Sequence, residues 1–429
     1  MTDLTQTLLP GLRQNRFPAL NLGDDLVYPQ YDGGSLLNVP STACRLLNIP
    51  EWGAPPLQPE ILSAVGGGQY DRVIVLVLDG LGLHSFQRFL QEGFGGVWQR
   101  LLPNSLLAPI TSICPSTTSA ALTTLWTGTP AASHGIAGYE LWLREYGVVA
   151  NMILHSAMTF LGDTGGLRRA GFEPETFLPD PVIGGHMKAH GVQPYAFLHQ
   201  SISRSGLSMM HLQDAHVNSY VSPADLWVSL ASLLNQKPDE RMYVYAYWGE
   251  LDTLSHLYGP DDERVAAEFN AFSHIFDTCF LGRLSAPARQ KTLLVLTADH
   301  GLTRTERDPH RDLRSHPELT RALHMQPTGE NRLTFFHLRP GQETFVRDYI
   351  EKNWPGQFSI LSSRQVLESG LMGPTPQPYE KLADRLGDLV AVAHGDAYFW
   401  WPNKENRLIG RHGGLSEREM LIPFFAVQV

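Results

Sequence analysis

Continuous apolar runs recur along the chain and alternate with amphipathic stretches. The runs at residues 73–78, 242–248 and 292–297 are rich in Val, Ile, Leu and Tyr, as is typical of strands that are covered on both faces. Helices are expected between them, near residues 85–92, after Pro115 and over residues 222–235. Strands that alternate with helices predict an α/β fold with a doubly wound, mostly parallel sheet.

The pattern changes after residue 302. A charged stretch is followed by alternating strand and helix signals at residues 332–338, 343–354, 358–361 and 364–369. We interpret residues 303–378 as an inserted small α+β lid subdomain. Residues 70–302 and 379–429 would form the core, with a strand at 388–393 rejoining the main sheet and another closing it at 421–429. Residues 1–69 are expected to wrap this core, with one short helix near 41–47.

Charge and cysteine content exclude several classes of protein. The chain has 33 basic and 43 acidic residues, a net charge of −10, and no basic run that could follow a nucleic-acid backbone. Its three cysteines are widely spaced, which argues against a disulfide framework and a thiolate zinc site. Neither a signal peptide nor an apolar segment of ~18 residues is evident. We therefore expect a soluble, cytoplasmic protein without a membrane partner.

Three of the strand-like runs lead into acidic residues, namely Asp79, Asp252 and Asp299. An Asp after a strand commonly caps a helix or starts a turn, so each has an ordinary structural explanation. His256 follows Asp252 by four residues, however, and His300 follows Asp299 directly. Residues four apart on a helix lie on one face. In sheets of this kind, functional sites gather at the carboxyl ends of the strands.

These side chains have the chemistry of a metal site. Asp and His without thiolates suit zinc or another divalent first-row metal. A later His412 is followed by two glycines, which allow the backbone to approach closely. Three Asp and three His are enough for two ions. Three carboxylates against two divalent cations leave about one positive charge, which favours an anionic substrate.

A candidate nucleophile lies at residues 113–128. Pro115 and several hydroxyl residues precede a run rich in Ala and Leu, the pattern of a helix start, so Ser116 is interpreted as a cap. A helix N-terminus is also an anion site, and a hydroxyl bound to a metal there loses its proton readily. The two interpretations are compatible.

The order of these motifs resembles the alkaline-phosphatase superfamily, and most closely its nucleotide pyrophosphatase/phosphodiesterase branch. The resemblance covers residues 73–429 and rests on the set listed here in chain order: Asp79, the segment from Pro115 to Thr118, Thr127-Gly128, His134-Gly135-Ile136, Asp252 with His256, Asp299-His300-Gly301 and His412-Gly413. It implies an alkaline-phosphatase-like fold. It also implies a hydrolase of small phosphorylated substrates, such as nucleotides or other phosphodiesters, that uses two divalent ions, zinc or manganese.

The resemblance assigns individual roles as well. One metal would be held by Asp79, Asp299, His300 and the Thr118 oxygen, and the other by the set Asp252, His256 and His412. Thr118 takes the place of the nucleophile that forms a phospho-threonine intermediate, with Thr117 as the rival.

The sharpest departure of the chain from the family pattern lies downstream of Thr118. Tyr139 stands where the branch has an Asn that binds a phosphate oxygen. This leaves open a phosphonate or phosphomonoester hydrolase, a phosphotransferase, or a metal-binding protein without activity.

Other polar and aromatic residues have weaker signals. In the expected lid, His310, His316 and His324 cluster, although histidines of this kind are more often structural. His394 is a candidate for orienting a metal ligand. Most of the remaining aromatic residues are expected in the core, a set that comprises Tyr243, Tyr245, Tyr247, Trp400 and Trp401. Trp248 and Tyr258 are candidates for the lining of a pocket, because they flank the segment that carries Asp252.

Overall fold

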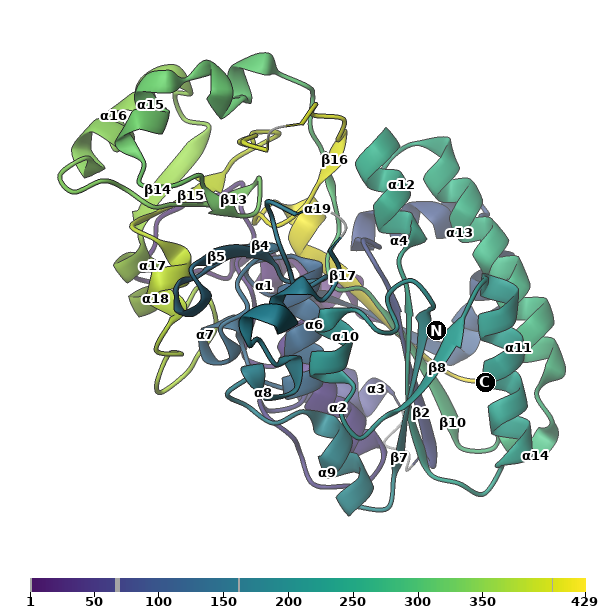
Figure 1. Ribbon diagram of the computed structural model, residues 1–429. Coiled ribbons are helices and arrows are strands. Elements are labelled where there is room, and N and C mark those ends of the chain that lie inside the picture. Colours follow the sequence, from purple (N-terminus) through teal and green to yellow (C-terminus); the bar gives the residue numbers. More distant parts are fainter. Residues whose placement is uncertain (1, 66–69, 161–162, 403) are drawn as a thin grey trace.

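The computed structural model describes residues 2–65, 70–160, 163–402 and 404–429. Its centre is an eight-stranded sheet (Figure 1). In spatial order the strands are β1 (Thr2–Asp3), β3 (Ser105–Thr111), β17 (Leu421–Gln428), β10 (Thr292–Thr297), β2 (Arg72–Leu78), β9 (Met242–Trp248), β7 (Gln193–His199) and β8 (His216–Tyr220). The strands from β10 to β8 are parallel, whereas β17 runs antiparallel to β10 and β3. The predicted mostly parallel sheet is confirmed.

Helices cover both faces of this sheet. In Figure 1, α4, α11, α13 and α14 lie on one side of the central strands, and α2, α6 and α9 lie on the other. The helices that belong to this layer are α1 (Thr5–Gln14), α2 (Val39–Leu46), α3 (Pro59–Ala64), α4 (Leu83–Gln91), α5 (Gly96–Leu101), α6 (Thr118–Thr127), α7 (Ala131–His134), α8 (Pro174–Phe177), α9 (Ile183–Ala189), α10 (Gly206–His211), α11 (Pro223–Gln236), α12 (Glu250–Tyr258), α13 (Glu263–Ile275), α14 (Ala286–Arg289) and α19 (Glu417–Met420). Because both faces are covered, every residue of β2, β9 and β10 is buried.

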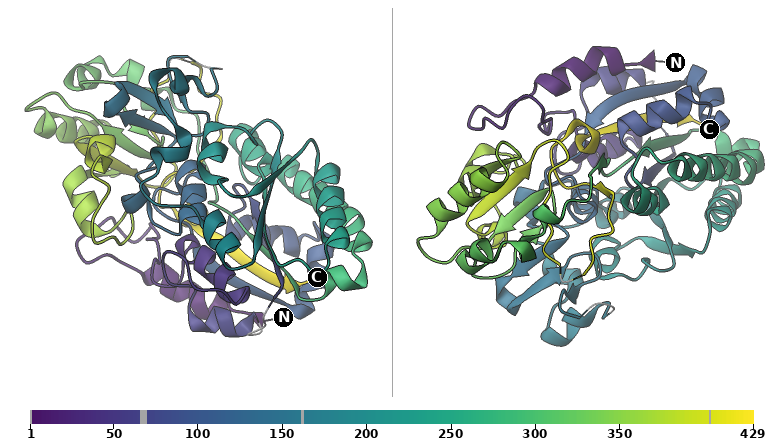
Figure 2. Two further views of the ribbon diagram at one scale, coloured as in Figure 1. Left: turned by 60° about the horizontal axis from the view of Figure 1, so that its bottom comes forward. Right: turned by 90° about the horizontal axis from the view of Figure 1, so that it is seen from above.

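A second, antiparallel sheet of seven strands lies beside the first (Figure 2). Its order is β14 (Phe358–Ser362), β15 (Leu389–Ala393), β13 (Leu333–Phe336), β12 (Thr328–Gly329), β4 (Glu140–Leu143), β5 (Val148–Asn151) and β6 (Ser156–Ala157). The helices packed around it are α15 (Pro317–Ala322), α16 (Glu343–Asn353), α17 (Ser363–Ser369) and α18 (Leu382–Leu386). A short pair, β11 (Thr303–Arg304) and β16 (Gly410–Arg411), runs antiparallel.

One sequence interpretation is wrong. The strand expected at 388–393 does not rejoin the main sheet, because β15 pairs with β13 and β14 in the second sheet. An apolar run looks the same in either sheet, so its sequence does not reveal its partner. The second sheet also takes β4, β5 and β6 from the segment before residue 303. The division at 303–378 stays a prediction, and the strands on either side of it already share this sheet.

The N-terminal segment contributes to the core as well as covering it. Its strand β1 pairs with β3 and forms one edge of the main sheet, and the predicted short helix is present as α2. Two further helices, α1 and α3, had no clear sequence signal. Most of residues 26–47 are buried, including Tyr28 and Leu36. A second, smaller apolar cluster lies under the second sheet around Trp354 and Phe399.

Candidate active site

The carboxyl ends of three neighbouring parallel strands carry the predicted acidic residues. Asp79 follows β2 directly, Asp299 lies two residues beyond the end of β10, and Asp252 lies in the first turn of the helix that follows β9. Since β2 pairs in parallel with both β10 and β9, the carboxyl ends of the three strands lie side by side. The topology therefore brings together side chains that are up to 220 positions apart in the chain.

Asp79, Asp299 and His300 form one group. The Nε2 atom of His300 lies 3.5 Å from Oδ1 of Asp79 and 3.5 Å from Oδ2 of Asp299. All three side chains are buried. The main chain also fixes Asp299, because the amides of Gly80 and His300 both donate to its Oδ1, at 3.2 and 3.0 Å. One oxygen of Asp299 is thus occupied and the other is left facing the group.

Asp252, His256 and His412 lie next to that group. Nε2 of His256 is 3.3 Å from one oxygen of Asp252, and Nε2 of His412 is 3.9 Å from the other. His300 is near both groups, since its ligand atom lies within 4.8 Å of those of Asp252 and His412 as well as those of Asp79 and Asp299. The six predicted Asp and His side chains are therefore contiguous, and His300 lies between the two sets.

All three imidazoles are oriented in the same way. The Nδ1 atoms of His256, His300 and His412 lie 2.8, 3.2 and 3.2 Å from main-chain carbonyl oxygens, which belong to Gly410, Gly301 and Ser116. A carbonyl only accepts a hydrogen bond, so Nδ1 carries the proton and the lone pair of Nε2 is directed at the carboxylates. This is the tautomer in which a histidine binds a metal through Nε2.

Three carboxylate oxygens in the cluster are buried and have no hydrogen-bond partner among the residues that the structure describes: Oδ1 of Asp79, Oδ1 of Asp252 and Oδ2 of Asp299. Burial, and then repulsion from Asp299 and Asp252, raises the pKa of Asp79 well above its usual value. Burial, and then the neighbouring His300 and His256, lowers the pKa of His412 well below its usual value. Neutral imidazoles beside unpartnered carboxylate oxygens are a donor set that fits divalent metal ions.

The segment that carries the candidate nucleophile reaches the same cluster. Helix α6 begins at Thr118, after Thr117, which has an extended backbone at φ −140°. The Thr118 Oγ1 lies 3.1 Å from Nε2 of His300. The Thr117 hydroxyl instead hydrogen-bonds the carboxylate of Glu330. Ser116 is not the helix cap, because Thr117 occupies the capping position. The Oγ of Ser116 instead donates to the carbonyl of Gly414 at 2.7 Å.

A cavity of about 740 Å³ opens onto this cluster. Its walls include Asp79, Thr118, Asp252, His256 and His412, together with apolar side chains of α6 and α10 and aromatic residues of β9. Two of the β9 tyrosines therefore do more than fill the core. The hydroxyl of Tyr247 donates to Asp79, and Tyr245 lines the cavity.

The second sheet supplies a wall that carries three polar residues, Tyr139, Glu140 and Glu330. The Tyr139 hydroxyl accepts a hydrogen bond from Asn151 at 2.6 Å, and its main-chain N–H donates to Glu330 at 2.7 Å. Burial raises the pKa of Glu330 to about 8 and that of Glu140 to about 7. Neither Glu carried a sequence signal, because both are positioned by strand pairing.

The weaker candidates are placed elsewhere or have structural partners. His316 bonds the carbonyl of His310 and the hydroxyl of Tyr349, and does not line the cavity. His394 lies between Asp25 and Ser359, so it orients no residue of the cluster. Of the two aromatic candidates for a pocket, Trp248 lines the cavity and Tyr258 does not. Trp400 and Trp401, expected in the core, are buried and also line the cavity.

Comparison with known proteins decides the family. The model of the type I phosphodiesterase / nucleotide pyrophosphatase family matches residues 73–415. The chain belongs to this family. It is therefore a hydrolase that acts on phosphoester bonds, and the family resemblance found in the sequence is confirmed. A search of the curated proteins found no match.

Solved structures share the fold of this chain. Murine ectonucleotide pyrophosphatase/phosphodiesterase 5 is 18% identical to this chain, with a TM-score of 0.61. The matched region covers 83% of this chain and 88% of the murine chain. Human ectonucleotide pyrophosphatase/phosphodiesterase 5 is 16% identical, with a TM-score of 0.61, and the matched region covers 82% of this chain and 87% of the human chain. Phosphonoacetate hydrolase from Sinorhizobium meliloti 1021, in complex with phosphonoformate, is 16% identical, with a TM-score of 0.59. The matched region covers 83% of this chain and 89% of the hydrolase chain.

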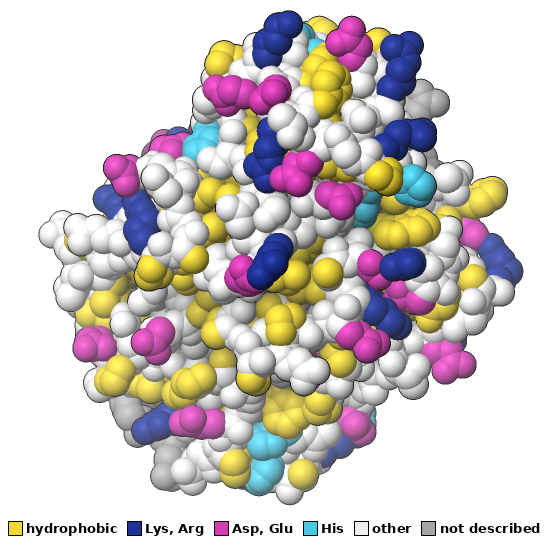
Figure 3. Space-filling view, turned by 90° about the vertical axis from the view of Figure 1, so that its left-hand side faces the viewer, with side chains coloured by type: hydrophobic (Ala, Val, Ile, Leu, Met, Phe, Trp, Pro, Cys, Tyr) yellow, Lys and Arg dark blue, Asp and Glu magenta, His cyan; other side chains and the backbone are white. Residues whose placement is uncertain are grey.

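On the face shown in Figure 3, basic and acidic side chains are interspersed, in line with the net charge of −10. Among the helices that the structure describes, none combines the length and the apolar character that crossing a membrane requires.

Proposed function

We propose that this phosphodiesterase hydrolyses small phosphodiesters or nucleotide pyrophosphates through attack by Thr118 at a site for two divalent metal ions. The position of one hydroxyl carries the proposal. The Thr118 Oγ1 lies at the N-terminus of α6, 3.1 Å from His300, at the junction of the two Asp/His groups. A helix N-terminus favours an anion, so a phosphoryl group is stabilised where this hydroxyl can reach it.

The chain offers ligands for both ions. Asp79, Asp299, His300 and Thr118 would hold one, and the other would be held by Asp252, His256 and His412. The unpartnered oxygens of the three Asp and the Nε2 atoms of the three His support these sets. Bound zinc or manganese would neutralise the charge of the phosphoryl group and lower the pKa of a coordinated hydroxyl.

The roles of the side chains follow from their positions. Thr118 attacks phosphorus and the leaving alcohol or phosphate departs, so that a phospho-threonine forms; water then cleaves the new ester and restores the hydroxyl. Thr118 and His300 lie 3.1 Å apart and would be ligands of the same ion, and the His300 ring is held through Nδ1 by the carbonyl of Gly301. Thr117 is the weaker candidate because its hydroxyl is directed to Glu330.

The substrate class rests on the cavity and on the family. A cavity of about 740 Å³ accommodates a small phosphorylated molecule. The murine relative has been solved with AMP, which supports a nucleotide or a similar diester. We also propose a reducing, cytoplasmic location, which the three unpaired cysteines support.

A panel of esters tests this function. The zinc- and manganese-loaded protein should cleave bis-p-nitrophenyl phosphate faster than p-nitrophenyl phosphate, and should leave p-nitrophenyl sulfate intact. Release of phosphate from phosphonoacetate with no cleavage of the diester would replace the proposal with a phosphonate hydrolase. A protein that binds zinc and cleaves none of these compounds would contradict it altogether.

A further inference from the structure

A serine, a histidine and an aspartate form a chain of hydrogen bonds at the second sheet, apart from the Asp/His cluster. The Oγ atom of Ser359 lies 2.8 Å from Nε2 of His394, and Nδ1 of the same ring lies 3.0 Å from Oδ2 of Asp25. None of these three residues lines the active-site cavity. They come from separate segments, since Ser359 lies on β14, His394 follows β15 and Asp25 belongs to the N-terminal segment.

The chemistry of the partners fixes the direction of each hydrogen bond. A carboxylate only accepts, so Nδ1 of His394 donates to Asp25, and Nε2 of the neutral ring carries the lone pair. The hydroxyl of Ser359 therefore donates to Nε2, and among the described residues it has no other hydrogen-bond partner. In this order of groups, a histidine that a carboxylate orients can take the proton of a serine hydroxyl and make it a nucleophile.

The main chain around these side chains is held by pairing with other strands and segments. Ser359 lies in the antiparallel ladder of β14 and β15, and the amide of His394 continues that ladder beyond the end of β15. Leu26, which follows Asp25, forms a β-bridge with Ser416. The three groups are therefore positioned by paired backbone and not by free loops, as a preorganised site requires.

A main-chain N–H next to Ser359 is placed to stabilise a negative oxygen. β14 is the last strand of the second sheet, so one side of it has no strand partner. Successive residues of an antiparallel strand direct their backbone groups to opposite sides. The amide of His394 donates to the carbonyl of Gln357, so Ser359 faces β15 and the N–H of Ile360 faces the open edge. The Ile360 carbonyl agrees with this direction, because it accepts from the Arg347 side chain at 2.7 Å. An N–H at such a position can serve as an oxyanion donor.

The three groups are open to solvent. The side chain of Asp25 is 54% exposed and that of His394 is 18% exposed, and Ser359 is half-buried. The two residues that follow His394, Gly395 and Asp396, are exposed as well. A surface site of this kind contacts little of its substrate, so it suits small esters with a good leaving group.

We propose that Ser359, His394 and Asp25 form a second hydrolytic site, which cleaves small carboxylic esters without a metal ion. The Oγ of Ser359 attacks the carbonyl carbon while its proton passes to Nε2 of His394. The C–O bond to the leaving alcohol then breaks, and the alcohol takes that proton. Water attacks the acyl-serine in the same way, which releases the carboxylic acid and restores the Ser359 hydroxyl. This activity goes beyond the proposed phosphodiesterase function and shares no residue with it.

Hydrolysis of p-nitrophenyl acetate in EDTA tests this site, because chelation removes any metal-dependent cleavage. The wild-type protein should turn over this ester repeatedly in mildly alkaline buffer. Ser359→Ala and His394→Gln should each lower the rate to that of the buffer, and Asp25→Asn should lower kcat/KM by on the order of 10²-fold. Ser369→Ala is the matched control and should keep the wild-type rate, since the Oγ of this half-buried serine donates to the carbonyl of Val366 and not to an imidazole.

Phenylmethanesulfonyl fluoride gives a second, covalent readout. The Oγ of Ser359 should bond to the sulfonyl sulfur as fluoride leaves and the proton passes to His394. Intact mass and peptide mapping should then locate a single sulfonyl group on Ser359. His394→Gln should slow this labelling strongly, and Ser359→Ala should stay unlabelled. The adduct of the wild-type protein decides the matter even if a variant does not fold.

The outcomes separate this site from the phosphodiesterase. Ester cleavage that survives in Ser359→Ala, or a sulfonyl group found on another residue, would overturn the second site. A wild-type protein that neither cleaves the acetate in EDTA nor takes up the sulfonyl group would overturn it as well. The bonds of His394 would then only tie the N-terminal segment to the second sheet. Failure to cleave bis-p-nitrophenyl phosphate with zinc present would instead contradict the phosphodiesterase function alone.

Discussion

The imidazole rings of His300 and His412 stack with their centroids 3.9 Å apart and their planes 20° apart. The first follows a strand of the main sheet, and the second follows β16, more than a hundred positions later. Each is held through Nδ1 by a main-chain carbonyl, so both Nε2 atoms are available to the cluster. This stacking joins the two Asp/His groups into one site.

Replacement of Thr118 by Ala should abolish turnover. The variant loses the hydroxyl that lies 3.1 Å from Nε2 of His300, so kcat should fall on the order of 10³-fold or more. Zinc content, measured by atomic emission, should stay near that of the wild type, because six Asp and His ligands remain. Thr117→Ala should lose far less activity, since that hydroxyl is bonded to Glu330. The opposite order of effects would make Thr117 the nucleophile.

Replacement of Asp79 by Asn should stabilise the metal-free protein and weaken the metal-loaded one. Without ions, burial and the nearby Asp299 and Asp252 disfavour the Asp79 carboxylate, and a neutral side chain of the same shape removes that repulsion. The melting temperature in EDTA should therefore rise by a few degrees. Added zinc should stabilise the wild type, by about 2.7 kcal/mol at a hundredfold excess over Kd, and the variant much less.

Calorimetry or dye-based thermal unfolding, with and without zinc, checks both halves of this prediction. Equal stabilisation of wild type and variant by zinc would show that Asp79 is not a ligand. A lower melting temperature of the variant in EDTA would show that the hydrogen bond from Tyr247 outweighs the repulsion.

The sequence predicted the main sheet and the grouping of the Asp and His side chains because both depend on local signals. An Asp directly after a buried apolar run predicts both the strand and the carboxyl end where the site lies, as at Asp79 and Asp299. Parallel pairing then brings these ends together without further information. The motif Asp252 with His256 is local as well, since both lie on α12.

The second sheet was harder to predict because its partners are distant in the chain. Tyr139 bonds Glu330 across 191 positions, and Gly329 pairs with Glu140. A single buried Glu does not belong to a repeating pattern of hydrophobic and polar positions, so the sequence does not reveal it. The same reason explains the error at β15, whose apolar run suits either sheet. Hydrophobic pattern thus determined which segments are strands, and tertiary pairing determined their neighbours.

The stability of the metal-loaded protein should depend on pH through Glu140. The pKa of this carboxyl is about 7 in the folded state, against an ordinary value of 4.5. Between these values the folded state keeps a proton that the unfolded state has released, so the free energy of unfolding falls as pH rises. The loss is at most about 1.4 kcal/mol per pH unit, or roughly 3 kcal/mol over this range.

Glu140→Gln removes this titration, so its stability relative to the wild type should increase from pH 5 to pH 8. Urea unfolding at the two pH values measures the difference, and Glu368→Gln, whose side chain is 62% exposed, serves as the control. Parallel pH profiles of Glu140→Gln and the wild type would show that Glu140 is ionised in the folded protein throughout this range.

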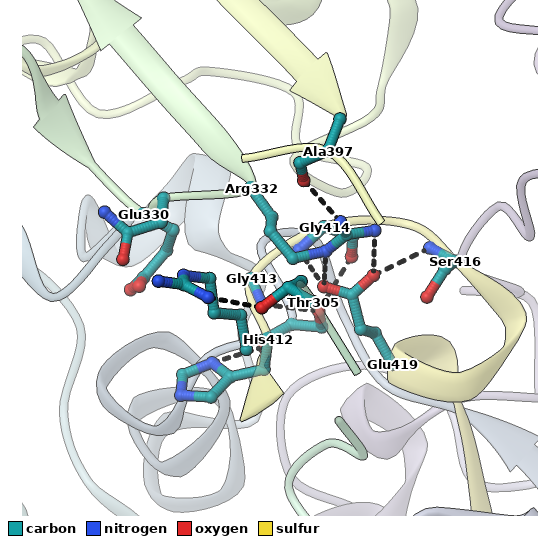
Figure 4. A network of polar contacts seen from close by, with 12 residues as sticks. Thr305, Glu330, Arg332, Ala397, His412, Gly413, Gly414, Ser416 and Glu419 are labelled. Carbon is teal, nitrogen blue, oxygen red and sulfur yellow. Dashed lines mark hydrogen bonds and ion pairs between the residues drawn. The ribbon is translucent and has the colours of Figure 1, made fainter. Parts of the chain in front are cut away.

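The buried ion pair of Arg332 and Glu419 should control both stability and the geometry at His412. Both side chains are fully buried, with Nε of Arg332 2.8 Å from Glu419 (Figure 4). Arg332 also donates to the carbonyls of Gly395 and Ala397. Glu419 accepts from the amides of Gly414 and Ser416, in the loop that follows His412. The pair therefore connects the second sheet to the loop that follows His412.

Removing one partner leaves the other charge buried, so Arg332→Met and Glu419→Gln should each cost about 3–5 kcal/mol in the free energy of unfolding. Each should also weaken zinc binding, because the loop after His412 loses its anchor. Arg364→Ala, at an exposed pair with Glu368, should cost no more than about 1 kcal/mol and leave zinc binding unchanged. Urea unfolding and zinc titration provide the measurements. Normal zinc affinity in a destabilised Arg332→Met would mean that the pair supports the fold without positioning His412.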